Sequence, residues 1–420
     1  MDVRVEPGKY WGKVTLPPSK AEMHRKIIIG TLAHAGRIDG SDDCDDTKAS
    51  FDAAYALVRT YPEGKEPEIR KCRCGSSAAT LRMLLPVTGV IGKKFLFEGS
   101  EQLSARPIKE LLDVLREHGM NVEGDSLPIT VSGKLQAGEY KISGNVTSQY
   151  ISGLLMALPM LDGDSTLEIT SELESKGYVD ITLKCLKEFQ IEIGGEFGKW
   201  QIKGNQTPIL PEPPKKAYEY VNPNYKHKFK KHQNPTSPGS GIKCEPDWSV
   251  AANYFVANMF GSEVQMDGLN ENSLQPDKAI VEDLKHLGET IDVSQTPDIA
   301  PILAVAAAGF NGDTVLSGCR RLKFKETDRI ANTVDMINAL GGNAESTDDS
   351  IIIHGTGKLV GGTVDPKGDH RIAMAATIAA QICEKGVNVL GANCVSKSCL
   401  NFFMDGTWLG AQMYYNSGII

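Results

Sequence analysis

One arrangement of hydrophobic and polar positions occurs four times along the chain. In the first copy, Ile108, Leu111, Leu112 and Leu115 follow one another at helical spacing, and the segment ends at Gly119. Residues three and four positions apart lie on the same face of a helix, and glycine is common just after a helix C-terminus. Two short strand-like stretches follow, MNVEG and PITVSG. This copy therefore predicts a helix followed by a β-hairpin.

The same succession is found again at residues 182–204, 280–293 and 333–357. A helix followed by a hairpin often arises by chance, but four good copies favour one building block used several times. Their spacing is too irregular for a solenoid. A chain of 420 residues is also too long to fold around a single hydrophobic core of ordinary size. We therefore expect an α/β (α+β) protein with two globular domains.

Residues 208–243 interrupt this pattern. The segment holds seven of the 21 prolines and seven lysines, and it has no amphipathic period. Such a composition is typical of a solvated insertion or linker, so we expect it near a domain boundary. Lysines interleaved with Tyr and Phe also suit a single-stranded nucleic acid, which leaves RNA binding as a remote alternative.

Composition and charge narrow the possible partners. The net charge of −8 argues against a general nucleic-acid or membrane-surface role. The N-terminal twenty residues lack signal-peptide and transit-peptide character, and no run of eighteen apolar residues occurs. Nine cysteines are scattered, and only Cys72 and Cys74 lie close together, which is a poor metal signature. We expect a cytoplasmic protein with reduced thiols and no metal, nucleic-acid or membrane partner.

Two segments place small polar or cationic residues where loops meet predicted helices. Ser19 follows two prolines and is placed to cap a helix that begins at Lys20, where the side chain and the helix dipole both favour an anion. The segment CGSSAATLRMLLP, residues 74–86, is a small-residue turn that runs into an apolar helix. Such a turn either brings backbone N–H groups close to an anion or simply packs tightly.

Two more segments extend this pattern with hydrogen-bond donors. Arg106 stands directly before a proline suited to the first turn of a helix. Thr147, Ser148 and Gln149 form a neutral hydrogen-bonding cluster at the start of an apolar helix. Together these segments predict a polar surface assembled from helix N-termini.

Two charged segments lie further along the chain. Lys325, Glu326, Asp328 and Arg329 fall within five residues, and periodicity alone favours an ordinary surface charge run there. Asp369 and His370 precede Arg371 at the start of a helix of small apolar residues. A cation at the start of a buried helix indicates a ligand contact rather than bulk water.

Several fixed cations in an acidic protein suit a small substrate that carries several negative charges. The cations are Lys20, Arg25, Arg106, Arg329, Arg371 and Lys397. Neither a G-x-x-x-x-G-K-[ST] loop nor a G-x-G-x-x-G fingerprint after a strand occurs, so no nucleotide site is predicted. These residues by themselves indicate a polyanion-binding α/β enzyme without metal or nucleotide.

Ten segments resemble, in order, the motifs of the 5-enolpyruvylshikimate-3-phosphate synthase family. They cover nearly the whole chain except 208–243, and the pair KETDR and DHR-x-AMA is highly specific. The segments are PPSK, GSSAATLR, LSARP, VTSQYISGLLMALP, ESKGYVDITL, EPDWSVAANYF, PDIAPILAVAAA, FKETDRI, GDHRIAMA and CVSKS.

The resemblance implies the two-domain enolpyruvyl transferase fold, in which each domain consists of three repeated βαβαββ units. It predicts an N-terminal domain of residues 18–243, insertion included, and a C-terminal domain of residues 1–17 plus 244–420. The substrates would be phosphoenolpyruvate and shikimate-3-phosphate, which bind between the domains without a cofactor. We expect a monomer.

The resemblance also implies a reaction. The 5-hydroxyl of shikimate-3-phosphate attacks C2 of phosphoenolpyruvate while C3 is protonated, and the tetrahedral intermediate then loses phosphate. By motif position, Asp298 is the candidate base for the hydroxyl, and Glu326 is the candidate acid and base at C3. Lys20 is a third catalytic candidate, because it resembles a lysine that holds phosphoenolpyruvate and assists proton movement.

Binding residues follow from the same motifs. The candidates for phosphoenolpyruvate are Lys20, Ala78, Arg106, Gln149, Arg329, Arg371 and Lys397. The candidates for shikimate-3-phosphate are Lys20, Ala21, Arg25, Thr147, Ser148, Gln149, Ser175, Tyr178, Asp298, Arg321 and Lys325. Without the resemblance, Asp298 and Tyr178 would be interpreted as capping and packing residues.

The chain departs from the family pattern at several positions. Ala21 stands where a serine is common, and Arg321 stands where an asparagine often contacts the sugar phosphate. Each lost hydroxyl contact would cost on the order of 1 kcal/mol of binding, which leaves the acid and base groups intact. Ala78 replaces a glycine beside the phosphoenolpyruvate pocket, and we hypothesise that its methyl group lowers sensitivity to the larger competitor glyphosate.

Two alternatives stay open at this point. The sister family that transfers enolpyruvate to UDP-N-acetylglucosamine usually carries a reactive cysteine in a mobile loop and lacks the KETDR and DHR-x-AMA pair. A non-catalytic binding protein with this fold would explain Ala21 and Ala79. It would not need the proton-transfer groups Asp298 and Glu326, which argues against it.

Overall fold

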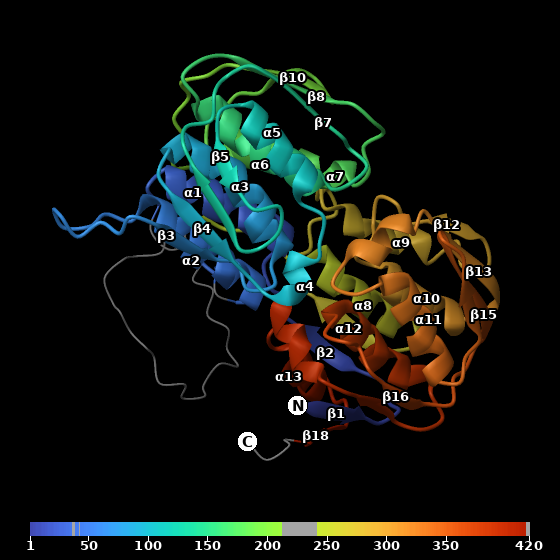
Figure 1. The fold of residues 1–420 in the computed structure, drawn as a ribbon. Helices are drawn as coiled ribbons and strands as arrows, with labels where there is room; N and C mark the ends of the chain where they lie inside the picture. Colours follow the sequence, from blue (N-terminus) through green and yellow to red (C-terminus); the bar gives the residue numbers. More distant parts are fainter. Residues whose placement is uncertain (36–37, 42, 212–241, 417–420) are drawn as a thin grey trace.

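The computed structural model describes residues 1–35, 38–41, 43–211 and 242–416. Residues 212–241 of the predicted insertion lie outside the described residues. Helices and short strands alternate throughout the described part (Figure 1). No helix within the described ranges is long and apolar enough to cross a membrane.

Four small sheets of the described chain share one topology. In each, a parallel strand pair is followed by two antiparallel neighbours. The strand orders are β3(Arg70–Arg73)-β4(Phe95–Glu98)-β6(Ile129–Ser132)-β5(Asn121–Glu123), β7(Glu139–Ile142)-β8(Ser165–Ile169)-β10(Lys199–Ile202)-β9(Gly194–Glu196), β12(Thr290–Asp292)-β13(Asn311–Ser317)-β15(Ser350–Thr356)-β14(Ala344–Ser346) and β16(Gly362–Val364)-β17(Val387–Val389)-β1(Asp2–Val5)-β18(Met413–Asn416). A fifth, parallel pair joins β2(Trp11–Val14) to β11(Glu263–Met266).

Helices separate the strands of these sheets. The longer α-helices are α1(Lys20–Leu32), α2(Asp45–Val58), α3(Ala78–Ile91), α5(Lys109–Glu117), α6(Ser148–Ala157), α7(Lys176–Glu188), α8(Trp248–Met259), α10(Ala300–Ala308), α11(Arg329–Ala339) and α12(His370–Ala379). Shorter α-helices are α4(Glu101–Ser104), α9(Ile280–Asp283) and α13(Phe402–Trp408). The 3-10 turns are η1(Leu158–Met160), η2(Pro276–Ala279), η3(Arg320–Phe324), η4(Ala380–Ile382) and η5(Ala392–Lys397).

The order of these elements gives the repeat. The runs β3-α3-β4-α5-β5-β6, β7-α6-β8-α7-β9-β10 and β12-α10-β13-α11-β14-β15 each read βαβαββ. In the fourth sheet, the N-terminal strand β1 supplies the strand between β17 and β18. The predicted α/β fold class with repeated units is confirmed, and the first strand lies among C-terminal elements (Figure 1).

The hairpin predictions are confirmed in three of the four copies. The hairpins β5–β6, β9–β10 and β14–β15 follow α5, α7 and α11. The copy at 280–293 is wrong, because α9 has only four residues and β12 pairs with β13 in parallel. After Leu284 the amides of Lys285 and His286 bond to carbonyls three residues back, a pattern that tightens the backbone and ends an α-helix.

Buried hydrophobic residues fall into two clusters. One lies within residues 23–242, and the other joins residues 3–16 to 248–411. Figure 1 shows them as two lobes, which we call the first lobe and the second lobe in that order. The two chain crossings lie side by side, since Ser19 N donates to Glu245 O at 2.7 Å and Asp247 N donates to Pro17 O at 2.9 Å.

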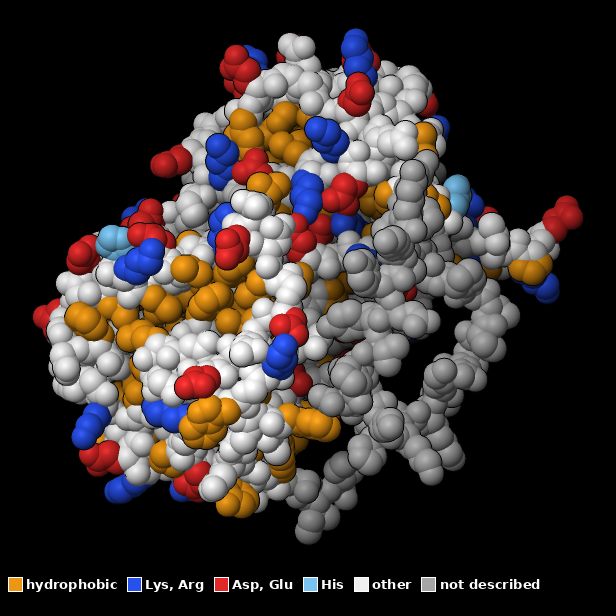
Figure 2. All heavy atoms as spheres, turned by 180° about the vertical axis from the view of Figure 1, so that it is seen from behind, with side chains coloured by type: hydrophobic (Ala, Val, Ile, Leu, Met, Phe, Trp, Pro, Cys, Tyr) orange, Lys and Arg blue, Asp and Glu red, His pale blue; other side chains and the backbone are white. Residues whose placement is uncertain are grey.

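Helices that are apolar on all sides lie at the centre of each lobe. In the first lobe these are α3 and α6, and in the second α10 and α12, and nearly every residue of each is buried. Because their flanks are covered, only their ends remain available to ligands. On the face shown in Figure 2, acidic and basic side chains are interspersed and do not separate by sign.

Candidate functional site

A cleft between the two lobes receives the N-terminal ends of helices from both. The cavity at its centre has a volume of about 120 Å³. Its walls include the first residues of α1, α3, α6 and α7 from the first lobe and of α8, α11 and α12 from the second. Backbone N–H groups and helix dipoles at these ends favour negatively charged ligands.

Short polar side chains begin these helices. Ser19, Ser77 and Thr147 accept hydrogen bonds from backbone amides inside α1, α3 and α6. Asp369 caps α12 by accepting from Arg371 N at 2.9 Å. The cap predicted at Ser19 is confirmed, and the predicted helix start at 147–149 is confirmed with Thr147 as its cap. These caps fix where Lys20 and Ser148 enter the cleft.

Lys20 is paired within the cleft before any ligand enters. Its ammonium lies 3.0 Å from Asp46 Oδ2, and both side chains are largely buried. Burial lowers the pKa of Lys20, but Asp46 outweighs this effect and raises it above its ordinary value. Lys20 is therefore a fixed cation with a carboxylate behind it.

Arg329 is the centre of the charged wall. Its guanidinium is 1% exposed and forms two hydrogen bonds with Asp369, from Nε to Oδ2 at 2.9 Å and from Nη2 to Oδ1 at 3.2 Å. The same side chain reaches Glu326 Oε2 at 2.7 Å and Asp298 Oδ1 at 3.1 Å. One buried arginine thus holds both candidate proton-transfer carboxylates in place.

Glu326 has two further cationic neighbours. Its Oε1 lies 3.2 Å from Lys397 Nζ and 3.7 Å from Arg106 Nη1, and its side chain is 10% exposed. Burial raises the pKa of the Glu326 carboxyl, but Lys397, Arg106 and Arg329 outweigh it and hold the pKa well below its usual range. Glu326 is therefore ionised at neutral pH.

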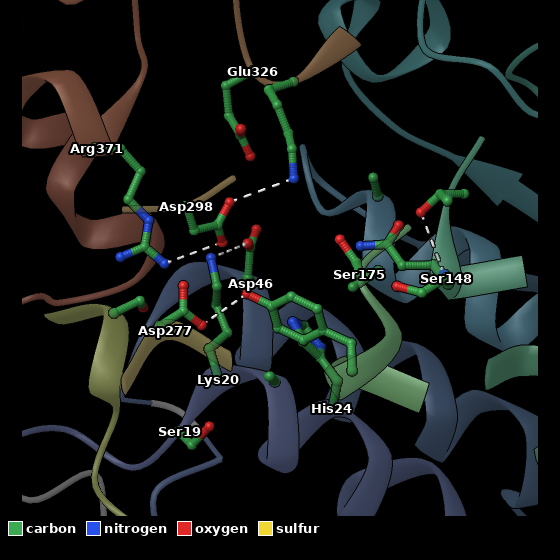
Figure 3. A pocket seen from close by; sticks show the side chains of 18 of the residues that line it. Ser19, Lys20, His24, Asp46, Ser148, Ser175, Asp277, Asp298, Glu326 and Arg371 are labelled. Carbon is green, nitrogen blue, oxygen red and sulfur yellow. Dashed lines mark hydrogen bonds and ion pairs between the residues drawn. The ribbon is translucent and has the colours of Figure 1, made fainter. Parts of the chain in front are cut away.

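Asp298 also lies beside three cations, of which Arg371 is labelled in Figure 3. Besides Arg329, its carboxylate lies 3.4 Å from Lys325 Nζ and 3.4 Å from Arg371 Nη2. Burial raises its pKa, and these cations lower it well below its ordinary value. Arg371 is buried, and its Nε and Nη1 have no hydrogen-bond partner among the described residues.

The opposite wall of the cleft offers hydroxyl groups and a buried arginine. Arg25 Nε donates to Thr182 Oγ1 at 2.6 Å, and its Nη2 donates to Ser152 Oγ at 3.0 Å and to Tyr178 O at 2.7 Å. Ser175 adopts a left-handed conformation with φ 59° just before α7. Its hydroxyl accepts a hydrogen bond from Arg321 Nη2 at 2.7 Å.

Comparisons with known proteins agree over nearly the full length. The sequence model described as EPSP synthase (3-phosphoshikimate 1-carboxyvinyltransferase) matches residues 5–216 and 220–405. The 3-phosphoshikimate 1-carboxyvinyltransferase of Clostridium kluyveri is 34% identical over 448 aligned positions, which cover 98% of each chain. The enzyme of the same name from Clostridium acetobutylicum is also 34% identical, with 98% of each chain covered.

The chain belongs to the EPSP synthase family. A solved structure of EPSP synthase from Acinetobacter baumannii superposes with a TM-score of 0.74 at 21% identity and covers 99% of this chain and 100% of its own. This superposition supports the fold. The predicted family, fold and enzyme class are therefore confirmed, and the enzyme is a 3-phosphoshikimate 1-carboxyvinyltransferase of the shikimate pathway.

Nearly all site residues predicted for an EPSP synthase lie together in the cleft. The residues that line it are Lys20, Ala21, Arg25, Ala78, Arg106, Thr147, Ser148, Gln149, Ser175, Tyr178, Asp298, Arg321, Lys325, Glu326, Arg329 and Arg371. Lys397 joins them through its ion pair with Glu326. Their individual roles stay predictions.

Two local interpretations from the sequence are wrong. The segment 325–329 is no ordinary surface run, because Arg329 is buried and Glu326 largely so. The proline after Arg106 does not occupy the first turn of α5, since the cap is Ile108 and the helix begins at Lys109. Instead, Arg82 Nη2 and Tyr150 Oη both donate to the Pro107 carbonyl, which anchors the backbone next to Arg106.

Sequence reasoning missed several polar residues that line the EPSP synthase cleft. They are His24, Asp46, Asp247 and Asp277. Asp247 carries a detectable signal, as an aspartate directly before an apolar helix that it caps through Ser249 N and Val250 N. Asp46 and Asp277 have no comparable local signal, because their partners Lys20 and Tyr178 are distant in sequence.

Proposed function

We propose that this cleft binds phosphoenolpyruvate and shikimate-3-phosphate side by side and transfers the enolpyruvyl group to the 5-hydroxyl of the acceptor. One observation carries the proposal. Asp298 and Glu326, both held by Arg329, face a single cleft that is otherwise lined by cations and hydroxyl groups. Two carboxylates serve two separate proton transfers, and the cations serve two highly anionic substrates.

Phosphoenolpyruvate is assigned to the side of the cleft around Glu326. Arg371 suits its carboxylate, because two of its guanidinium nitrogens are buried without a partner. Gln149 and Ala78 border the space assigned to this substrate. The phosphate of phosphoenolpyruvate is assigned to the remaining cations. These cations are Lys20, Arg106, Arg329 and Lys397.

Shikimate-3-phosphate is assigned to the side around α6 and α7. Thr147 and Ser148 begin α6, where the helix dipole and hydroxyl groups favour its phosphate. Lys325 and Arg321 add charge there, and the remaining contacts come from the walls beside them. Those residues are Lys20, Ala21, Arg25, Gln149, Ser175 and Tyr178.

Proton transfer follows from the two carboxylates. Asp298 takes the proton of the 5-hydroxyl as its oxygen bonds to C2 of phosphoenolpyruvate, and Glu326 delivers a proton to C3. Glu326 then removes a proton from the new methyl group as the C2–O bond to phosphate breaks. Phosphoenolpyruvate competes for Lys397, Arg106 and Arg329, so its binding weakens their hold on Glu326 and raises the pKa of that carboxyl toward protonation.

The division of the chain into two domains supports a cleft that closes between them. We assign residues 18–243 to one domain and residues 1–17 plus 244–420 to the other, because the two hydrophobic clusters separate near these bounds. Substrates bind at the line where the domains meet. The cytoplasmic location and the monomeric state are further proposals, motivated by the composition of the chain.

The direct test is phosphate release from phosphoenolpyruvate with and without shikimate-3-phosphate. We expect release only with the acceptor, and a loss on the order of a hundredfold or more in Glu326→Gln, which keeps the shape of the side chain. The exposed Glu282→Gln serves as a control and should behave like the unmodified protein. Release that ignores the acceptor, or that survives Glu326→Gln, contradicts the proposal.

A further inference from the structure

Asp277 connects the two lobes at the acceptor side of the cleft. It lies in η2 of the second lobe, is 3% exposed, and accepts a hydrogen bond at 2.8 Å from the Tyr178 hydroxyl of α7 to its Oδ2. Two other second-lobe side chains reach the same turn of α7. Arg321 donates to Ser175 Oγ, and Gln295 Oε1 accepts from Lys176 N at 2.8 Å.

The second oxygen of Asp277 has no such partner. Oδ1 is buried and makes no hydrogen bond to any described residue. Figure 3 shows this carboxylate between Lys20 and Arg371 and below Asp298, and Asp277 is one of the residues that line the cleft. A buried carboxylate oxygen is costly to leave unpaired, so this position calls for a hydrogen-bond donor from a ligand.

The neighbours of Asp277 restrict the kind of ligand group. Burial and the nearby Asp298 raise its pKa to about 7, although Arg371 opposes them. Both the carboxylate and Asp298 repel another anion. Phosphoenolpyruvate has no hydroxyl group to donate from, whereas shikimate-3-phosphate has two free ring hydroxyls. One of these reacts and is assigned to Asp298, which leaves the 4-hydroxyl.

We infer that Asp277 is an acceptor-binding residue whose Oδ1 accepts a hydrogen bond from the 4-hydroxyl of shikimate-3-phosphate while its Oδ2 holds the Tyr178 hydroxyl. The inference rests on the proposed function. Because Asp277 and Tyr178 come from different lobes, this contact also couples recognition of the acceptor ring to closure of the cleft. Asp277 thereby selects acceptors that carry a hydroxyl next to the reacting one.

The test compares shikimate-3-phosphate with its 4-deoxy analogue in the unmodified protein. Above pH 7, where Asp277 is ionised, we expect kcat/KM to fall on the order of tenfold to a hundredfold for the analogue, as for loss of a hydrogen bond to a charged group. Equal use of both acceptors overturns the inference and leaves the proposed function standing. Failure to use shikimate-3-phosphate at all overturns the proposed function itself.

Variants then assign the effect to Asp277. Asp277→Ala should use both acceptors equally, with KM for phosphoenolpyruvate little changed. The isosteric Asp277→Asn, which replaces a charged hydrogen bond by a neutral one, should reduce the discrimination severalfold. Asp283→Asn is a matched control, because Asp283 Oδ2 is also buried and unpartnered but lies outside the cleft lining. Discrimination that is undiminished in both Asp277 variants overturns the inference.

Discussion

The two walls of the cleft are built in different ways. The first-lobe wall presents short neutral side chains at helix starts, such as Ser148 and Ser175, with Lys20 and Arg25 beneath them. The second-lobe wall is a network of buried opposite charges around Arg329. Hydroxyl groups at a helix start bind an anion without changing charge, whereas a charge network sets the protonation of its own members.

Under the proposed function, both proton-transfer carboxylates lie on the second wall, and the first wall contributes mainly to binding. On the first wall, loss of one hydroxyl group should weaken substrate binding by the free energy of one hydrogen bond. On the second wall, each carboxylate depends on several cations, so a single substitution alters the charge balance of the whole group. The walls meet through Tyr178 and Asp277 at one side and through Lys397, which also donates to Ser76 O at 3.2 Å, at the other.

The largest expected contrast compares one residue from each wall. Asp298→Asn removes the proposed base and should lower kcat on the order of a hundredfold to ten-thousandfold. Ser148→Ala removes one hydroxyl and should raise the KM for shikimate-3-phosphate about tenfold, with kcat little changed. Steady-state kinetics with both substrates measures the two effects. A larger loss of kcat in Ser148→Ala than in Asp298→Asn would reverse the assignment of the walls.

A second contrast concerns the stability of the charge network. Arg329→Met keeps much of the volume but leaves Asp369, Asp298 and Glu326 without their shared cation. We expect the free energy of unfolding to fall by about 3–5 kcal/mol, as when one partner of a buried ion pair is removed. Arg73→Met, at an exposed pair with Glu98, should cost about 0–1 kcal/mol. Urea unfolding compares them, and equal midpoints would refute the structural role of Arg329.

The third contrast is in pH dependence. Burial lowers the pKa of Lys325 to about 8, with Arg329 and Arg321 adding to the effect and Asp298 opposing it. Lys325 is charged below this pH and neutral above it, so kcat/KM for shikimate-3-phosphate should fall as pH rises through about 8. Lys325→Arg stays charged and should shift this decline to higher pH. An unchanged decline in Lys325→Arg would exclude Lys325 as its cause.

The contrast between the walls also explains what the sequence predicts. Helix starts are local, because a cap and the apolar residues after it lie within one turn. The cap at Ser19, the helix start at 147–149 and three of the four hairpins could therefore be predicted from local sequence. The prediction of a helix and hairpin at 280–293 was wrong, because after one α-helical turn the backbone amides bond to carbonyls three residues back. No single residue in the sequence marks that change.

The charge network of the second wall could not be predicted from the local sequence pattern. Lys325, Glu326 and Arg329 have the spacing of a surface charge run, and their burial depends on Asp298 and Asp369, which come from distant segments. Arg329 was counted among the fixed cations, but only resemblance to a family selected Lys325 and Glu326. Even the family resemblance did not identify Asp277, because its neighbours are Tyr178 from the other lobe and Asp298 and Arg371, all distant in sequence. Pairing across a fold is the information that one sequence without homologues lacks.

The smallest predicted effect is at the edge of the first wall. Ala78 is the first residue of α3, is 5% exposed, and lines the cleft beside the space assigned to phosphoenolpyruvate. We expect its methyl group to narrow that space for a larger competitor more than for the substrate. Ala78→Gly should therefore lower the glyphosate concentration that halves activity by about fivefold or more, as for one methyl-sized contact. The KM for phosphoenolpyruvate serves as the internal control and should change less, and equal glyphosate sensitivity of the two proteins would show that this wall does not discriminate by size at Ala78.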